Sequence, residues 1–292
     1  MRIREKRHPK WMKVPLPVGS GFNEVKRLVK DNQLHTVCQS AHCPNIGECW
    51  GQGTATFMIL GDICTRNCRF CAVTSGKPGS VDFDEPKRVA EAVKTLSLKY
   101  AVITSVTRDD LPDGGSSIFA SVINKIREQT PDCRIEVLIP DFLGSQKSLE
   151  QVFLARPDVL NHNLETVPSL YSEVRPAASY SRSLQVLHLA KQNGLISKSG
   201  IMLGLGETHE EVIQVMRDLR KVNCDFLTLG QYLQPSASHL PIEKYIEPDE
   251  FVQLKEEGMA LGFKHIESGP LVRSSYHAAI GFDECDRSEM EN

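Results

Sequence analysis

Six of the nine cysteines of this chain lie between residues 38 and 71, in two groups of three. The second group is Cys64, Cys68 and Cys71, in the segment CTRNCRFC. Three thiolates on a short loop can hold three irons of a [4Fe–4S] cube. No fourth cysteine stands nearby, so one iron would stay open for another ligand. The spacing therefore predicts an iron–sulfur cluster in which one iron can bind a ligand other than cysteine.

Phe70 stands directly before the last cysteine of this group, so the segment reads C-x3-C-x-Φ-C, where Φ is aromatic. In this feature the chain resembles radical S-adenosylmethionine (SAM) enzymes. The resemblance implies that the open iron chelates SAM, and that one electron from the cluster releases a 5′-deoxyadenosyl radical. A structural zinc site is the alternative, because C-x2-C also suits tetrahedral zinc. Zinc usually needs a second matching pair, and the other cysteines are spaced differently.

Cys38, Cys43 and Cys49 form the other group, C-x4-C-x5-C, whose intervals are long for zinc but suit a cube. Both groups, followed by GPLVRSSYHA at residues 269–278, resemble the lipoyl synthase family over nearly the whole chain. The resemblance implies an auxiliary [4Fe–4S] cluster on the first group, with Ser275 of the R-S-S-Y motif as fourth ligand. A serine alkoxide is a hard ligand among soft thiolates. The alternative is that these serines only form hydrogen bonds in a loop.

The segments that must position these residues alternate between short apolar runs and amphipathic helices, with Asp84 and Thr208 as expected helix N-caps. The alternation predicts an α/β fold, a partial (β/α)6 TIM-like barrel at residues 55–232, with extensions at 1–54 and 233–292. Its active site would lie at the carboxyl ends of the strands. Six strands are expected, at 56–60, 101–105, 134–139, 159–163, 198–203 and 226–229, and Val and Ile dominate several of them.

Contacts to SAM are carried over from the resemblance onto matching positions. Residues 200–207, GIMLGLGE, fit a G-x-I-x-G-x-x-E pattern with Met202 in place of isoleucine; a tight strand–helix turn is the alternative for the glycines. Thr104 and Ser105 replace the usual glycine-rich stretch. Arg182 would pair the SAM carboxylate, or is an exposed arginine at a helix start. The complete implied set is Phe70, Thr104, Ser105, Asn163, Glu165, Arg182, Met202, Gln231 and Leu233.

The resemblance implies insertion of sulfur at C6 and C8 of an octanoyl chain on a carrier-bound lysine. Alkane C–H bonds are far outside the range of side-chain bases, so a radical must remove the hydrogen. Two SAM molecules per product are expected, with the auxiliary cluster as sulfur donor. The expected partners are an octanoylated carrier domain (dehydrogenase E2 or glycine-cleavage H protein), a ferredoxin- or flavodoxin-type electron donor and a cluster-repair protein.

Charge and hydropathy limit the remaining classes of function. The net charge of −3 does not indicate nucleic-acid binding, and no apolar run approaches the roughly 20 residues of a membrane span. Residues 1–13 hold six basic residues and one acidic residue, which indicates a solvated terminus or a docking patch for an acidic carrier. We expect a cytoplasmic protein, or an organellar one if a transit peptide has been removed. Cys133, Cys224 and Cys285 are expected to be small buried residues.

Two rival classes fit the sequence less well. Biotin synthases and methylthiolating enzymes also insert sulfur by radical chemistry, but neither explains the spacing of Cys38, Cys43 and Cys49 together with R-S-S-Y. A zinc-stabilised nucleic-acid-binding module would need a basic stripe interleaved with aromatic residues. Only residues 1–13 approach one, and Trp11 is their sole aromatic residue.

Overall fold

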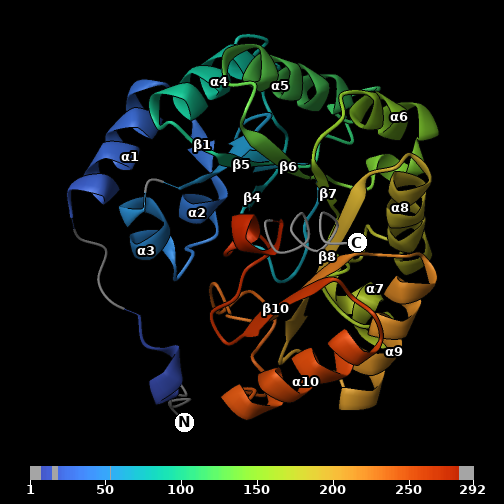
Figure 1. Cartoon of the computed structure of the whole chain (residues 1–292). Coiled ribbons are helices and arrows are strands. Elements are labelled where there is room, and N and C mark those ends of the chain that lie inside the picture. Colours follow the sequence, from blue (N-terminus) through green and yellow to red (C-terminus); the bar gives the residue numbers. More distant parts are fainter. Residues whose placement is uncertain (1–7, 15–18, 53, 283–292) are drawn as a thin grey trace, which may run out of the picture.

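A curved sheet with helices on its outer face forms the body of the protein (Figure 1). The computed structural model describes residues 8–14, 19–52 and 54–282. Most of the basic segment 1–13 and all of Cys285 lie outside these residues, so the predictions made for them stay predictions. No helix within the described ranges is long and apolar enough to span a membrane.

The larger sheet has the strand order β1-β2-β5-β6-β7-β8-β9-β10. Its strands from β2 to β10 are parallel to their neighbours, and β1 pairs antiparallel with β2. This confirms the expected α/β partial barrel, and every predicted strand ends within two residues of its prediction. The strands are β1 His35–Thr36, β2 Thr56–Ile59, β5 Tyr100–Ser105, β6 Arg134–Leu138, β7 Val159–Asn161, β8 Ile196–Leu203, β9 Phe226–Gln231 and β10 His265–Gly269.

The sheet continues beyond the predicted strands into the C-terminal extension. β10 pairs in parallel with β9, and α10 (Pro248–Ala260) connects the two. The sequence pattern missed β10 because Ile266 is its only buried apolar side chain. Polar residues at His265 and Glu267 gave it no hydrophobic run to recognise.

Helices connect the parallel strands along the outside of the barrel. Thr208 caps α9 as predicted, in a capping box with Glu211, whereas Asp84 stands at the N-cap position of α4 without a side-chain capping bond. The helices are α1 Ser20–Asp31, α2 Val37–Ser40, α3 Ile46–Gly51, α4 Glu85–Thr95, α5 Ser116–Gln129, α6 Gln146–Leu154, α7 Tyr171–Val174, α8 Tyr180–Gln192, α9 His209–Lys221 and α10, with 3-10 turns at Lys10–Met12, Phe142–Gly144 and Pro168–Leu170.

The hydrophobic core lies between the sheet and this outer layer. Ile103 of β5 is completely buried in one apolar cluster with Val93 of α4 and Ile123 of α5. Alternate residues of a strand point to opposite faces, so Val102 and Thr104 belong to the inner face. Polar side chains can therefore lie on the inner face of the sheet without entering the apolar core.

Charged side chains on the inner face form one buried network across β6, β7 and β8. The Lys198 ammonium donates to both carboxylate oxygens of Glu136, at 3.0 and 3.1 Å. The Asn161 amide and the Tyr100 hydroxyl donate to the same carboxylate, at 3.0 and 2.8 Å. Glu136 and Lys198 are both almost fully buried, so each charge depends on the other for compensation.

Replacing Lys198 by Met is expected to destabilise the protein by about 3 to 5 kcal/mol, because it leaves the Glu136 carboxylate buried and uncompensated. The apparent midpoint of thermal unfolding, followed anaerobically by circular dichroism, should fall by roughly 5 to 15 °C. Lys221→Met is the matched control, because Lys221 forms an exposed ion pair with Asp218. Equal small shifts in both variants would contradict the prediction.

Candidate active site

The loop that carries Cys64, Cys68 and Cys71 follows β2 and is closed by a two-stranded ribbon, β3 (Ile63–Cys64) and β4 (Thr74–Ser75). The sulfur of Cys64 accepts hydrogen bonds from the backbone N–H groups of Arg66 (3.4 Å) and Thr107 (3.3 Å). The N–H of Cys71 donates to the carbonyl of Cys68 at 3.1 Å, which forms a turn between the two cysteines. The loop is thus closed on itself at the carboxyl end of β2.

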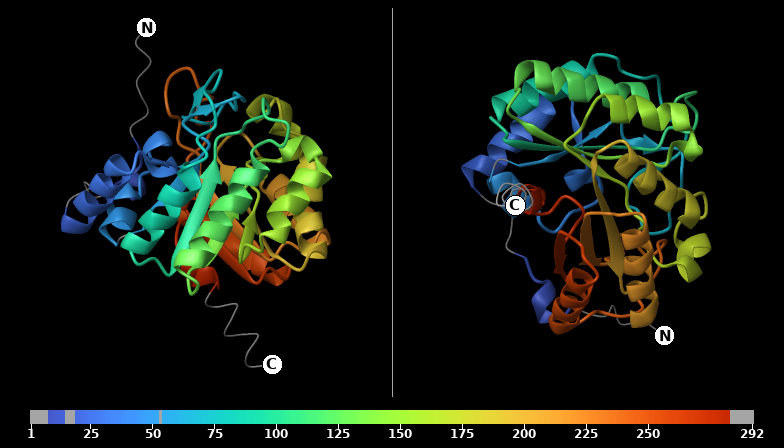
Figure 2. Two further views of the ribbon diagram at one scale, coloured as in Figure 1. Left: turned by 90° about the horizontal axis from the view of Figure 1, so that it is seen from above. Right: turned by 45° about the vertical axis from the view of Figure 1, so that its right-hand side comes forward.

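Segments distant in the sequence hold this loop from outside. The N–H of Arg69 donates to the carbonyl of Val174 (3.0 Å), and the carbonyl of Arg69 accepts from Leu240 (3.1 Å). The Nε2 of His239 lies 3.0 Å from the carbonyl oxygen of Cys71. Figure 2 (left) shows the cyan cysteine loop and the orange segment after β9 rising from the same end of the barrel.

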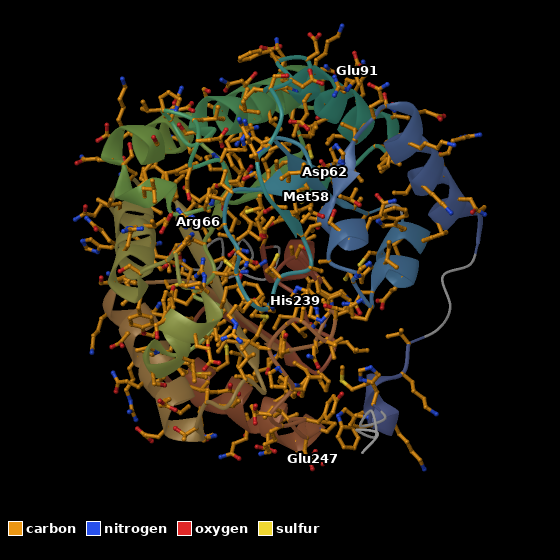
Figure 3. The ribbon with its side chains drawn as sticks, turned by 180° about the vertical axis from the view of Figure 1, so that it is seen from behind. Met58, Asp62, Arg66, Glu91, His239 and Glu247 are labelled. Carbon is orange, nitrogen blue, oxygen red and sulfur yellow. The ribbon has the colours of Figure 1, made fainter. Side chains whose placement is uncertain are left out.

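Arg66 ties the cysteine loop to two further strand ends. Its guanidinium donates to both oxygens of Asp109 (2.7 and 2.9 Å) and to Asp141 (2.6 Å). Burial alone would raise the pKa of Asp141, but the contact with Arg66 outweighs it and lowers that pKa to about 2. Figure 3 shows Arg66 in the middle of the molecule with Asp62 and His239, whereas Glu91 and Glu247 lie at the periphery.

The thiols of this loop lie near enough to one another for their charges to raise the pKa of Cys68 and of Cys71. Burial, together with the neighbouring thiolates of Cys68 and Cys64, raises the pKa of Cys71 to about 12. Burial also raises the pKa of Cys68, which Arg175 opposes. Thiolates that repel one another in a buried place are stabilised by metal, which deprotonates a bound thiol outright. The donor set therefore fits an iron–sulfur cluster.

Residues expected to bind SAM line the neighbouring strand ends. The amide of Asn163 donates to Glu165 (3.0 Å), while its Oδ1 is buried and has no hydrogen-bond partner in the described chain. A side chain at Gly200 would place Cβ 2.8 Å from that oxygen, so glycine is required there for close approach. Gly204 and Gly206 have positive φ, as the turn alternative expected. The free Asn163 oxygen fits a polar ligand.

Of the other residues expected to contact SAM, some have a free hydrogen-bonding group, and others are already hydrogen-bonded within the protein. Ser105 has a buried hydroxyl without a partner in the described residues, whereas the Thr104 hydroxyl donates to Leu138 (3.1 Å). Arg182 pairs with Asp141 at 3.1 Å, so its guanidinium is partly committed. The Gln231 side chain is fully committed to the chain itself, donating to Leu203, Tyr232 and Lys244 and accepting from Ile246.

An apolar group faces the same end of the barrel. Phe70 and Met202, both half-buried, pack in one cluster with residues that follow β8 and β9. Leu233 is half-buried just beyond β9. The other members of the cluster are Val174, Leu205, Tyr232, Leu240, Leu170 and Ile242.

The first cysteine group surrounds a separate cavity of about 180 Å³. Cys38 lies in α2, Cys49 in α3 and Cys43 between them, and Arg273 and Ser275 complete the wall. Burial, together with the thiolates of Cys38 and Cys43, raises the pKa of Cys49 to about 12. This group, too, fits the cationic core of an iron–sulfur cluster.

The C-terminal segment lies beside this cavity. The Asn45 amide donates to the carbonyl of Leu271 at 2.7 Å, although 226 residues separate them in the sequence. The hydroxyl of Thr56 donates to that of Ser275 at 2.8 Å. In Figure 1 the red C-terminal segment lies beside the blue helices α2 and α3.

Neither cysteine group has the geometry of a mononuclear zinc site. No three His, Cys, Asp or Glu side chains converge on a single ion within the described ranges. A cube differs in this respect, because each of its cysteines binds a different iron. Cys133 and Cys224, as predicted, are buried away from both groups.

Comparison with known proteins identifies the family. The radical SAM superfamily model matches residues 58–219, and the model of the N-terminal domain of lipoyl synthase matches residues 2–43. The lipoyl synthase of Rubrobacter xylanophilus is 56% identical over 272 residues, covering 92% of this chain and 85% of the relative. That of Koribacter versatilis is also 56% identical, covering 92% and 90%. The chain belongs to the lipoyl synthase family.

Solved structures agree on the fold of this lipoyl synthase family member. Methylornithine synthase superposes with a TM-score of 0.53 at 16% identity, covering 86% of this chain and 79% of the other. The FeFe-hydrogenase maturase HydG from Carboxydothermus hydrogenoformans gives 0.56 at 14% identity, covering 90% and 78%. At these identities the likeness shows the fold alone.

Membership of the family confirms the predicted activity. The protein is a sulfurtransferase that uses SAM and two [4Fe–4S] clusters to insert two sulfur atoms at C6 and C8 of a protein-bound octanoyl-lysine. The sulfur comes from the auxiliary cluster, and its protein substrate is an octanoylated lipoyl carrier.

Sequence reasoning missed several residues that shape the site. Arg66 stands inside the cysteine motif, so its position alone could have marked it. Its partners Asp109 and Asp141 carry no local signal, because only folding brings their strand ends together. Arg175 and His239 were missed for the same reason.

Replacing Arg66 by Lys is expected to slow reductive SAM cleavage roughly tenfold or more, because a lysine cannot make the forked contacts that orient the cysteine loop. The measurement is 5′-deoxyadenosine formed per minute by the anaerobic, cluster-loaded protein. Arg69→Lys is the matched control, since Arg69 lies in the same loop but forms an exposed pair with Glu173. Equal rates in the two variants would contradict a positioning role for Arg66.

Proposed function

We propose that Cys64, Cys68 and Cys71 hold the cluster that cleaves SAM, and that Cys38, Cys43, Cys49 and Ser275 hold the auxiliary cluster. One observation carries the second assignment. Ser275 lines the same cavity as the three cysteines although more than 200 residues separate them. The Thr56 hydroxyl fixes the Ser275 oxygen there with a 2.8 Å hydrogen bond.

The chain's own residues divide the remaining work. When bound, the first cluster supplies the electron that cleaves SAM, and the auxiliary cluster supplies sulfide. The side-chain oxygens of Asn163 and Ser105, which are buried without a partner in the described chain, would bind the polar part of SAM. Glu165 is held beside Asn163, and Phe70 and Met202 offer an apolar wall to adenine.

Arg182, Thr104, Gln231 and Leu233 complete the proposed SAM site in weaker roles. Arg182 would share its guanidinium between Asp141 and the SAM carboxylate. The Thr104 hydroxyl and the Gln231 side chain are engaged within the protein, so they would act through their backbone. The backbone of residues 231–233 is proposed to meet adenine.

The partners of the reaction follow from its chemistry. The carrier is proposed to be a dehydrogenase E2 lipoyl domain or a glycine-cleavage H protein. A ferredoxin- or flavodoxin-type protein would supply electrons, and a cluster-repair protein would rebuild the auxiliary cluster. The cytoplasm, or an organelle, is the proposed location.

The activity is tested by incubating the anaerobic, reduced protein with SAM and an octanoyl-lysyl peptide. We expect a peptide that gains two sulfur atoms and about two 5′-deoxyadenosines per product. Deoxyadenosine without sulfur in the peptide would point to a different acceptor. No SAM cleavage by a protein that holds both clusters would refute the proposal.

The ligand assignment is tested by Ser275→Ala. Loss of the oxygen ligand should leave SAM cleavage within a few-fold of wild type but lower the sulfur-bearing product by roughly 10- to 100-fold. Mössbauer spectra of the 57Fe-loaded protein should show an altered auxiliary cluster. Ser274→Ala is the matched control, because Ser274 is the neighbouring serine and does not line the cavity. If the two variants behave alike, Ser275 is not the ligand.

A further inference from the structure

Arg175 directly follows α7 and lies against the cysteine loop. The N–H of Arg69, the residue after Cys68, donates to the carbonyl of Val174 at 3.0 Å. Phe70 packs in the same apolar cluster as Val174. These contacts bring the backbone at Arg175 beside Cys68, and the Arg175 charge lowers the pKa of the Cys68 thiol against the effect of burial.

Uncharged groups hold the Arg175 guanidinium. Its Nη1 donates to the carbonyls of Asn163 (2.7 Å) and Leu164 (3.1 Å) and to the hydroxyl of Tyr171 (3.0 Å). Its central carbon lies 5.5 Å from the centre of the Tyr171 ring. The Nε–H is buried and has no hydrogen-bond partner in the part of the chain that the structure describes.

The other arginines at this end of the barrel are neutralised by carboxylates. Arg66 binds Asp109 and Asp141, Arg182 binds Asp141, and Arg69 pairs with Glu173 at the surface. Arg175 is hydrogen-bonded to no carboxylate in the described ranges. The buried carboxylates of Glu165 and Asp141 act on it only through longer-range electrostatics, and Glu165 accepts its hydrogen bond from Asn163.

A buried charge is costly unless an opposite charge compensates it. An iron–sulfur cluster on three thiolates is an anion, and its reduction potential depends on nearby charge and on hydrogen bonds to sulfur. We propose that Arg175, which is hydrogen-bonded to no carboxylate, places its positive charge beside the Cys68 corner of the SAM-cleaving cluster, and thereby makes that cluster easier to reduce. This rests on the proposed ligands Cys64, Cys68 and Cys71.

The test is a redox titration of the holoenzyme without SAM, followed by electron paramagnetic resonance. In Arg175→Met the ratio of reduced to oxidised cluster at a fixed potential should fall at least about tenfold, a shift of about 59 mV to more negative potential for a one-electron couple. Arg175→Lys retains the charge and should stay closer to wild type. An unshifted potential in Arg175→Met would overturn the proposal.

Controls separate charge from structure. Arg69→Met removes an exposed charge of the same loop and should leave the potential unchanged, as should Tyr171→Phe, which removes one acceptor of Arg175 but no charge. The auxiliary cluster in the same molecule should titrate as in wild type. Equal shifts in Arg175→Met and Arg175→Lys, or in both clusters, would mean a structural role and overturn the proposal.

Two further measurements keep this proposal distinct from the assignments beneath it. Iron content and the reduced spectrum of a Cys64→Ala variant test the ligands alone; an unchanged cluster there would refute the ligand assignment. A wild-type potential in Arg175→Met together with a raised KM for SAM would make Arg175 a SAM ligand, and would overturn the electrostatic role.

Discussion

The guanidinium of Arg66, shared between Asp109 and Asp141, sets the position of the cysteine loop relative to the sheet. The loop leaves β2, whereas the two carboxylates follow β5 and β6, so one side chain couples three neighbouring strand ends. Since Arg66 and Asp141 are almost fully buried, separating them would leave charges without water or partners. The loop can therefore move only together with the edge of the sheet.

The auxiliary site depends on a different constraint, the packing of the C-terminal segment against the N-terminal helices. Cys38 and Cys49 lie on the short helices α2 and α3, and Cys43 lies between these helices. The C-terminal segment packs beside them through Asn45 and Leu271, and through Thr56 and Ser275. Thr56 belongs to β2, the strand that leads to the other cysteine loop. One strand thus links the two sites.

Buried charged side chains have different partners in different parts of the barrel. At the inner face Glu136 and Lys198 neutralise each other and are supported by neutral donors, which makes them a structural pair. At the carboxyl ends of the strands Arg175 has only neutral acceptors. Arg273 is likewise buried beside Cys43, where the pKa of its guanidinium is lowered by burial. Positive charge without a carboxylate partner is found where thiolates gather.

The sequence by itself determined the cysteine chemistry and the strand–helix alternation. Ligand spacing is a local property, and strands buried on both faces carry short apolar runs, such as residues 57–59 of β2 and 101–103 of β5. Tertiary structure alone decided the rest. β10 has one buried apolar side chain, Ile266, so its place depends on pairing with β9. Arg66 pairs with Asp109 and Asp141, and Arg175 lies beside Cys68, only because the carboxyl ends of the parallel strands lie at the same end of the barrel. No local sequence pattern predicts these contacts, since each residue's partner follows a different strand.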